Sequence, residues 1–494
     1  MKLTGRLALF LLCAAMLLTT FGCSNTGSAE TAADTAAEQT AETVPEETAF
    51  HWKNGVEVND YEGYTFTLLN GCTASWFSYT LIVPEESTGE PVNDAFYERN
   101  MRVNELLNVE ITENNVSDSA ADLRTAVKAG TNDFDVALCT LMNSYAIAME
   151  NNIYDLNTID GFNFSNVWWD QNAVDDLTIN DKLYFVTSSS DTTRLDSIRA
   201  LFFNKEMVEE FAMENPYTLV DEGKWTIDVF TEMCQTVVTD LDGDGKMTDL
   251  DRYGWISYTA IMTDLLINGM NNRYLYIDSE TGRVANGTIG EEFYDAFSKV
   301  YDLVNSPDDA VFNIQASKHS GHLRGMGDRI QEQIFVENGA LFYSECLAWS
   351  RVMREMEADF GILPPPKYDE AQERHYSIII NPFMQMIPVT SEDTARTANV
   401  MEAFAAASHD TVVPAYIDIT LTGKVARDTD TVRMLNLVFD ELAYNLHFSS
   451  LSLRSASENV VKSGRENNLV SQLEAKESAT ATELEKINAF FFEE

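Results

Sequence analysis

The residues best suited to chemistry form an acidic segment, 240–251, with the sequence DLDGDGKMTDLD. Oxygen-bearing side chains occupy its first, third, fifth, ninth and twelfth positions, and a glycine occupies the sixth, where a calcium-binding loop needs a sharp turn. Hard oxygen ligands at this spacing can surround a Ca²⁺ ion. The predicted ligands are the side chains of Asp240, Asp242, Asp244, Thr248 and Asp251 and the backbone carbonyl of Lys246.

We expect a structural role for this calcium ion. The segment that follows the loop, 252–256, reads as a strand, whereas a calcium sensor has a second helix there. The twelfth position holds Asp251 where sensors have Glu, which resembles the loops of dockerins. The alternative interpretation is an acidic surface turn without a metal.

Motifs of enzyme catalysis are missing from the sequence. It contains no G-x-S-x-G nucleophile turn, no H-E-x-x-H zinc motif and no P-loop. The six histidines are scattered, and the pair His319 and His322 has no third metal ligand nearby in the sequence. We therefore predict no catalytic residues and no enzyme activity.

Four cysteines lie beyond the N-terminal region, without a C-x-x-C pair, and are either small buried side chains or two disulfides. They are Cys72, Cys139, Cys234 and Cys346.

Composition limits the partners. Among 494 residues, 33 are Lys or Arg and 79 are Asp or Glu, which gives a formal charge of −46. A field of this sign repels phosphate backbones, so a nucleic-acid partner is excluded. The hydrophobic fraction of 45% and aromatic fraction of 11% predict folded domains over most of the chain, and we expect a monomer.

The N-terminal residues predict export. In residues 1–22, Lys2 and Arg6 precede an apolar run, 7–20, that is shorter than the ~20 residues of a membrane span, so we expect a signal peptide. Gly22-Cys23 resembles a bacterial lipobox, in which the cysteine becomes the acylated N-terminus. We expect Cys23 to carry an acyl anchor such as palmitate, and residues 23–56 to form a disordered acidic tether. The alternative is plain secretion, with Cys23 an ordinary thiol.

Strand and helix patterns alternate at the start of the folded region. Strands are expected at 64–69, 109–111 and 134–138, with helices at 92–107 and 120–129 between them. This β-α-β-α-β order predicts an α/β fold with a parallel sheet between helices. Further strands are expected at 181–186, 198–203, 252–256, 340–343, 359–363 and 377–380, and further helices from 205, from a cap at Thr226, over 391–407 and within 429–494.

Several short motifs, in this order, resemble one family over residues 60–490. The resemblance is to the extracellular solute-binding proteins of carbohydrate ABC importers, the maltose-binding-protein-like family 1. The motifs are Phe134-Asp135-Val136, Asp155-Leu156-Asn157, Trp168-Trp169-Asp170-Gln171-Asn172-Ala173, Lys182-Leu183-Tyr184-Phe185-Val186, Leu201-Phe202-Phe203-Asn204-Lys205, Trp225-Thr226-Ile227-Asp228 and Phe360-Gly361-Ile362-Leu363-Pro364. The run Thr187-Ser188-Ser189-Ser190 departs from the Gly or Pro that the family often has after its hinge strand.

The resemblance implies two α/β lobes of mostly parallel sheets, joined by a hinge. Lobe one is expected at 57–187 and 372–410, and lobe two at 191–368 and 411–494. It also implies a protein anchored outside the bacterial cytoplasmic membrane that closes over a small solute, a mono- or oligosaccharide, and delivers it to an ABC permease. The alternative function is a secreted calcium-dependent carbohydrate-active enzyme or a surface adhesion module.

Candidate solute contacts follow the predicted strand ends, because ligands of parallel sheets bind there. Sugars need aromatic faces for their C–H groups and polar side chains for their hydroxyls. We expect Trp168 and Trp169 to be core residues instead. The candidate contacts are Trp76, Tyr79, Asn143, Tyr145, Asp191, Arg194, Glu345, Trp349 and Asn381.

Overall fold

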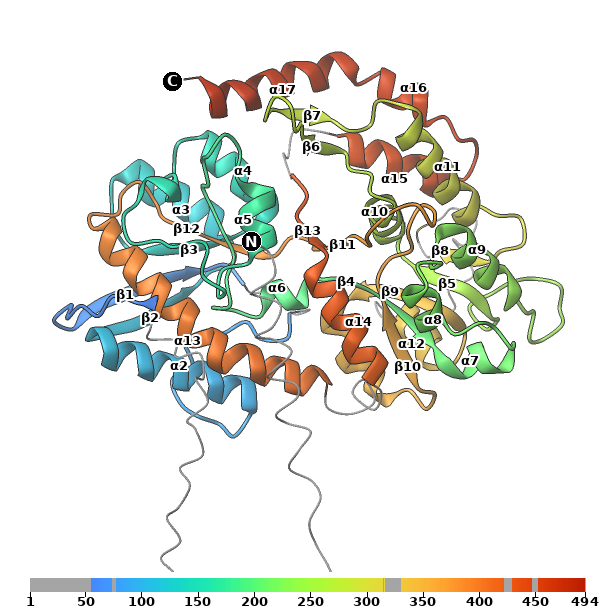
Figure 1. Cartoon of the computed structure of the whole chain (residues 1–494), viewed down its shortest axis with the longest axis horizontal. Coiled ribbons are helices and arrows are strands. Elements are labelled where there is room, and N and C mark those ends of the chain that lie inside the picture. Colours follow the sequence, from blue (N-terminus) through green and yellow to red (C-terminus); the bar gives the residue numbers. More distant parts are fainter. Residues whose placement is uncertain are drawn as a thin grey trace, which may run out of the picture. The chain divides into compact units, whose positions relative to one another are not determined.

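The computed structural model describes residues 55–72, 77–313, 315, 330–421, 429–446 and 452–493, all within the unit Gly55–Glu494 (Figure 1). Only the backbone is described at 330, 331, 354, 355 and 419–421. The signal peptide, the anchor residue Cys23, most of the tether and the candidate contact Trp76 lie outside the described residues.

The first sheet contains β1 (Tyr64–Asn70), β2 (Val109–Asn115), β3 (Val136–Thr140) and β12 (Phe383–Met386), in the order β12-β3-β1-β2. β1 runs parallel to both β2 and β3, with Leu68 opposite Val136, which confirms the predicted parallel arrangement. β12 has no counterpart in the sequence prediction and runs antiparallel to β3, with Phe383 opposite Thr140.

Helices pack around the first sheet, and together they form the first lobe. The helix α2 starts with a proline after the cap Glu90, and α3 is capped by Asp118 and ends at Gly130 with φ 68°, a left-handed conformation that favours glycine. Near the sheet lie α2 (Pro91–Leu107), α3 (Ser119–Ala129), α4 (Leu141–Met149), the 3₁₀ turn η2 (Leu156–Thr158) and α5 (Gln171–Leu177).

A long helix, α13 (Thr394–Leu421), packs along α2 (Figure 1). It begins three residues later than predicted, because the Asp393 carboxylate accepts a 3.0 Å hydrogen bond from the backbone N–H of Arg396. It also continues well past the predicted end at 407, so the expected lobe boundary at 410–411 falls inside one helix.

The second sheet contains five strands in the order β10-β4-β9-β5-β8. They are β4 (Arg199–Asn204), β5 (Tyr253–Ser257), β8 (Val311–Asn313), β9 (Ala340–Cys346) and β10 (Phe360–Leu363). β5 runs parallel to β8 and β9, whereas β4 runs antiparallel to β9 and β10. The predictions of strands at 198–203, 252–256, 340–343 and 359–363 are therefore confirmed.

The second lobe consists of this sheet with the helices and the hairpin around it. Thr226 caps α9 as predicted, since its hydroxyl accepts from the Val229 N–H at 3.4 Å. The strands β6 (Leu275–Ile277) and β7 (Val284–Asn286) form an antiparallel hairpin. The helices are α7 (Lys205–Glu210), α8 (Pro216–Asp221), α9 (Ile227–Thr236), α10 (Thr259–Gly269), α11 (Glu291–Val304), α12 (Ile330–Val336), η4 (Leu347–Glu355), α14 (Thr429–Asp440), α15 (Leu453–Ser463), α16 (Leu469–Glu474) and α17 (Glu477–Phe492).

The prediction of a strand at 181–186 is wrong. Asn180 and Asp181 both have positive φ, 50° and 59°, and form a two-residue turn between Ile179 and Lys182. Beyond this turn only an isolated bridge pairs Val186 with Gln385. The predicted strand 377–380 is reduced to β11 (Ser377–Ile378), which pairs with β13 (Leu442–Ala443).

The segment that crosses between the two sheets is polar but buried. Ser188 and Ser190 lie in it, and both hydroxyls accept hydrogen bonds from the Gln385 amide, at 3.0 and 2.6 Å. The fully buried Arg99 donates to the Ser190 carbonyl at 2.8 Å and lies 3.6 Å from the centre of the Phe404 ring. The short helix α6 (Thr193–Asp196) ends this segment.

Trp168 and Trp169 are core residues, as predicted. They are 2% and 1% exposed, and both indole N–H groups donate to the buried carboxylate of Glu402 on α13, at 2.6 and 2.9 Å.

Candidate functional site

The carboxyl ends of the parallel strands are the natural place for a site in this fold. In the first lobe, β1 ends at the fully buried Asn70, whose amide donates to the Thr80 carbonyl at 2.9 Å and to Glu113 at 3.0 Å. These bonds fix the loop after β1, which carries Ser78 and Tyr79. Tyr79 is half-buried, and its hydroxyl donates to Glu90 at 2.9 Å.

Asp196, at the end of α6, joins this loop to the crossing segment. Its carboxylate accepts from both the N–H and the hydroxyl of Ser78 at 2.6 Å, and from the hydroxyl of Tyr416 on α13 at 2.7 Å. Burial raises the pKa of Asp196, while the hydrogen bonds of Ser78 and Tyr416 and the charge of Arg351 act against that rise. Asp196 therefore joins the crossing segment to the loop after β1 and to α13.

The second lobe contributes the end of β9 and η4 to the same region. Glu345 forms an ion pair with Arg199. The Nη1 atom of Arg199 also lies 3.1 Å from the Cys346 sulfur. Trp349 on η4 is half-buried. Burial raises the pKa of both Asp196 and Tyr79, and the charge of the exposed Arg351, also on η4, acts against that rise in both. The structure thus places the predicted residues Tyr79, Glu345 and Trp349 on elements that meet at α6.

Two further candidates, Asn143 and Asn381, lie near each other. Asn381 has a positive φ of 51°, and its side chain accepts from the Met142 N–H at 2.9 Å, at the start of α4. Asn143 is the next residue of that helix and is exposed. Both amides therefore stand at the carboxyl end of β3.

Of the other three candidates, Tyr145 and Asp191 are buried and Arg194 is half-buried. Tyr145 is 1% exposed and packs edge-on against Phe185, with ring centres 4.8 Å apart. Asp191 is 2% exposed and accepts from the Thr193 N–H at 2.8 Å. Arg194 forms a 3.0 Å ion pair with Asp170. In this arrangement their side chains serve packing and the crossing segment, and solute contact by them stays a prediction.

A cavity of about 640 Å³ lies on another part of the molecule, between α5 and the β6–β7 hairpin. The sequence did not indicate it, because its walls come from α5, the β6–β7 hairpin and neighbouring segments, none of which follows a predicted strand. Asp176 of α5 lies 3.6 Å from Arg273 across this cavity, and accepts from the Tyr444 N–H at 2.8 Å. The walls include Asp175, Asp176, Arg273, Tyr276, Asn286 and Tyr376.

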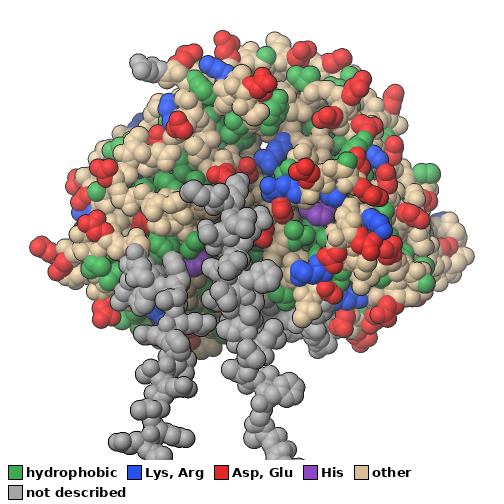
Figure 2. Space-filling view, in the orientation of Figure 1, with side chains coloured by type: hydrophobic (Ala, Val, Ile, Leu, Met, Phe, Trp, Pro, Cys, Tyr) green, Lys and Arg blue, Asp and Glu red, His purple; other side chains and the backbone are tan. Residues whose placement is uncertain are grey.

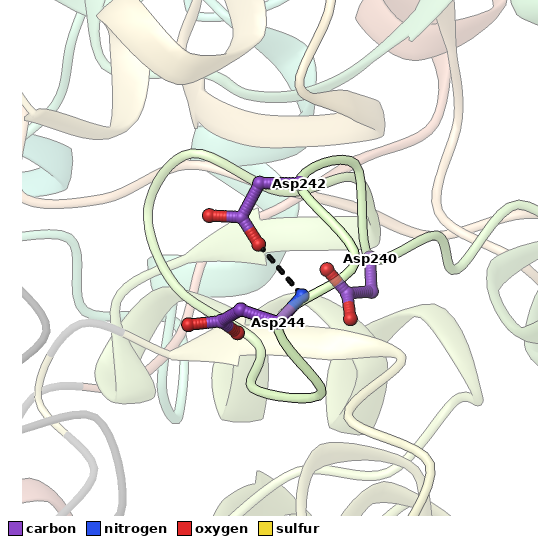
Figure 3. A group of neighbouring side chains, drawn as sticks. All are labelled: Asp240, Asp242 and Asp244. Carbon is purple, nitrogen blue, oxygen red and sulfur yellow. Dashed lines mark hydrogen bonds between the residues drawn. The ribbon is translucent and has the colours of Figure 1, made fainter.

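The acidic loop brings three of its predicted ligands together (Figure 3). One carboxylate oxygen from each of Asp240, Asp242 and Asp244 lies within 4.8 Å of the others. Asp240 accepts from the N–H groups of Gly245 and Gly243, both at 2.7 Å, and these bonds lower its pKa. Three ionised carboxylates at this spacing repel one another, so a divalent cation fits here.

Asp251 occupies a different part of the loop. It is 1% exposed, and its carboxylate accepts from the N–H groups of Leu241 and Thr248, at 2.9 and 2.7 Å. It therefore holds the ends of the loop together, next to the paired backbone of Thr239 and Arg252. Asp251, Thr248 and Lys246 stay predicted ligands.

The four cysteines beyond the N-terminal region, Cys72, Cys139, Cys234 and Cys346, are buried free thiols. Burial is the first cause that raises the pKa of each, so none is an activated nucleophile. Within the described part of the chain, every helix is too short or too polar to cross a membrane.

Comparisons with known proteins support the fold. No protein-family model matches the sequence, and no curated sequence is detectably similar to it. UspC of M. tuberculosis is similar in structure, with a TM-score of 0.57 and 15% identity, over 86% of this chain and 100% of its own. A cyclo/maltodextrin-binding protein complexed with maltotetraose has a TM-score of 0.55 and 12% identity, over 83% of this chain and 97% of its own.

An ABC substrate-binding protein from Listeria monocytogenes in complex with cycloalternan gives a TM-score of 0.53 and 12% identity, over 85% of this chain and 98% of its own. The chain therefore has the two-lobed α/β fold of such binding proteins, with a hinge between the lobes.

Proposed function

We propose that this protein is the solute-binding subunit of an ABC importer, which captures a small carbohydrate between its lobes and releases it unchanged to a permease. The observation that carries the proposal is that the loop after β1 of the first sheet and the end of β9 in the second sheet meet at α6. There, Asp196 is bonded to the first-lobe loop through Ser78, and Arg351 of the second lobe lies beside it.

The chemistry of this region suits a sugar. Tyr79 and Trp349 supply aromatic faces, while Glu345 and Arg199 supply charged hydrogen-bonding groups at the end of β9. Sugars bind to this combination because their C–H faces are apolar and their hydroxyls need directed partners. The carbohydrate class is also suggested by the maltotetraose and cycloalternan in two of the similar structures.

The N-terminal sequence supports a proposal about the location. We propose that Cys23 is acylated, and that the acidic tether lets the folded lobes reach a permease from the outer face of the membrane. We also propose that Asp240, Asp242 and Asp244 hold a structural Ca²⁺, with the remaining oxygens from Thr248, Asp251, the Lys246 carbonyl or water.

Isothermal titration calorimetry against a panel of mono- and oligosaccharides tests the proposal. We expect saturable binding of one sugar per chain, and the sugar recovered afterwards should be chemically unchanged. Trp349→Ala should weaken binding at least tenfold, since a central aromatic contact contributes more than about 1.4 kcal/mol. Tyr276→Ala, in the cavity beside β6, should leave the affinity as it is.

Three outcomes would contradict this assignment. The absence of heat with every sugar would remove the carbohydrate proposal. Conversion of the sugar would favour the carbohydrate-active enzyme. A loss of binding in Tyr276→Ala alone would move the solute to the cavity.

A further inference from the structure

A second cavity, of about 800 Å³, lies within the second lobe, between the end of α10, the first turns of α11 and the segment 368–372. Figure 1 shows α10 and α11 next to each other in that lobe. The volume is in the range of roughly 300–1,000 Å³ that small-molecule sites have. This α11 cavity adjoins the cavity beside β6, with which it shares Asn271, Asn272 and Glu292.

Hydrogen bonds hold the walls of the α11 cavity in place. The Gln372 side chain donates to the carbonyl of Gly269, the last residue of α10, at 2.8 Å, and accepts from the Tyr368 N–H at 2.9 Å. The Tyr368 hydroxyl donates to Asp295 on α11. The segment 368–372 is therefore tied to both helices, and the cavity is formed before a ligand enters it.

Aromatic rings and an amide in these walls suit a sugar ring. Two half-buried tyrosines line the cavity from different sides, Tyr294 on α11 and Tyr368 on the segment 368–372. Tyrosine rings offer apolar faces to the C–H groups of a sugar. The side chain of the exposed Asn271 can both donate to hydroxyl groups and accept from them.

The α11 cavity is also strongly negative. Four carboxylates belong to its walls, and none of the described residues that line it is Lys, Arg or His. The hydrogen bond to Asp295, desolvation and the charges of nearby carboxylates raise the pKa of Tyr368 to about 12. A positive charge on a ligand is therefore favoured here. The four acidic residues are Glu291, Glu292, Asp295 and Asp369.

The edge of the cavity already holds one ammonium group. Lys299, next to the wall residue Ser298 on α11, has its Nζ 5.3 Å from the centre of the Tyr368 ring and donates to Asp228 at 2.6 Å. A tyrosine face and a carboxylate both attract an ammonium group, by a cation–π contact and by a charged hydrogen bond. The walls offer the same two kinds of partner to the amine of a ligand.

We propose that the α11 cavity binds an amino sugar, a carbohydrate with a protonated amino group, at a site separate from the one proposed for the solute between the lobes. The sugar ring lies against Tyr294 and Tyr368, and the amine binds to Glu291 and Glu292, which are exposed in the first turn of α11. A neutral sugar would leave these carboxylates without a counter-charge, and a linear amine would leave the tyrosine faces without a ring.

Isothermal titration calorimetry at low salt and mildly acidic pH tests the proposal, with the β-linked dimer of glucosamine as the probe. We expect saturable binding that is at least tenfold tighter than binding of two comparison ligands. One is the N-acetylated dimer, which has the rings without the charge, and the other is spermidine, which has amines without a ring. Added NaCl should weaken binding of the glucosamine dimer, because salt screens exposed charges.

Two variants locate the bound dimer. Tyr294→Ala removes one ring, and Glu291→Gln removes one exposed charge that only the α11 cavity contains. Each should weaken binding several-fold or more. The matched controls are Tyr301→Ala, two turns further along α11, and Glu477→Gln, in the first turn of α17, and both should bind as wild type does. Thermal unfolding should show that all four proteins fold.

Three results would overturn the proposal. Equal or tighter binding of the N-acetylated dimer or of spermidine would show that the cavity does not recognise an amino sugar. Binding of the glucosamine dimer that neither Tyr294→Ala nor Glu291→Gln weakens would place the ligand elsewhere on the molecule. The absence of heat with all three ligands would leave the cavity without the proposed function.

Discussion

At the scale of single residues, His375 is a buried base that pairs with a backbone carbonyl. It is 6% exposed, and its Nδ1 lies 2.9 Å from the Pro365 carbonyl, to which it donates. Burial lowers its pKa from 6.5 to about 4; the charge of Lys367 acts the same way and the hydrogen bond acts against it. Between these two pH values, His375 therefore binds a proton in the unfolded chain but stays neutral in the folded chain.

This proton linkage predicts how stability depends on pH. Above about pH 6.5, His375 is neutral in both states and does not reduce the unfolding free energy. As the pH falls from there to about 4, protonation of His375 in the unfolded chain lowers the unfolding free energy by roughly 3 kcal/mol. His375→Gln has no such titration. Urea unfolding at pH 7 and pH 4 should therefore show that the stability difference between wild type and variant shrinks at low pH. An equal difference at both pH values would contradict the prediction.

The same scale shows what the sequence could and could not predict about the site. Residue type and position after a strand selected Tyr79, Glu345 and Trp349, and the elements that carry them meet at α6, while solute contact by these three stays a prediction. The pattern also selected Tyr145, but this residue stands one turn inside α4 and faces Phe185 in the core. It missed Asp196, because its role depends on Tyr416 and Ser78, which are distant in sequence.

At the scale of elements, the loop 240–251 provides a prediction about metal binding. Its three converging carboxylates should bind Ca²⁺ and stabilise the fold, by about 2.7 kcal/mol at a calcium concentration of 100 times Kd. We expect the thermal midpoint to rise with CaCl₂ and to fall with EGTA. The double variant Asp240→Asn and Asp242→Asn should lose this response.

Asp278→Asn is the matched control for the calcium experiment. The Asp278 carboxylate also accepts from the amides of a tight turn, those of Glu280 and Thr281, at 3.2 and 2.8 Å. This variant should keep the full response to calcium. Equal midpoints of wild type in CaCl₂ and EGTA would instead favour the plain acidic turn.

Elements with strong local signals were predictable, and those defined by distant partners were not. The helix 92–107 and the strand 198–203 each carry their own apolar period and boundary residues, and both agree with the structure within one residue. β12 is short, and it exists because β3 offers it an edge. The extension of α13 past 407 likewise depends on packing along α2, which is more than 280 residues earlier in the sequence.

At the scale of the whole molecule, negative charge is spread over the surface. Figure 2 shows Asp and Glu scattered across the visible face, with Lys and Arg fewer among them. The formal charge of −46 makes copies of the chain repel one another. This favours a molecule that works as a monomer near a membrane and reaches it through an anchor, since anionic lipid headgroups repel it as well.

The attachment of the molecule to the membrane is therefore predicted to depend on Cys23. A single acyl chain gives only marginal binding, so stable attachment needs more than one chain on this residue. Expressed in a bacterial host, wild type should sediment with membranes and carry acyl groups detectable by mass spectrometry of its N-terminal peptide. Cys23→Ser should leave the membrane fraction, whereas the neighbouring control Ser24→Ala should remain in it. Equal partitioning of Cys23→Ser and wild type would show that the Gly22-Cys23 junction is not a lipid-attachment site.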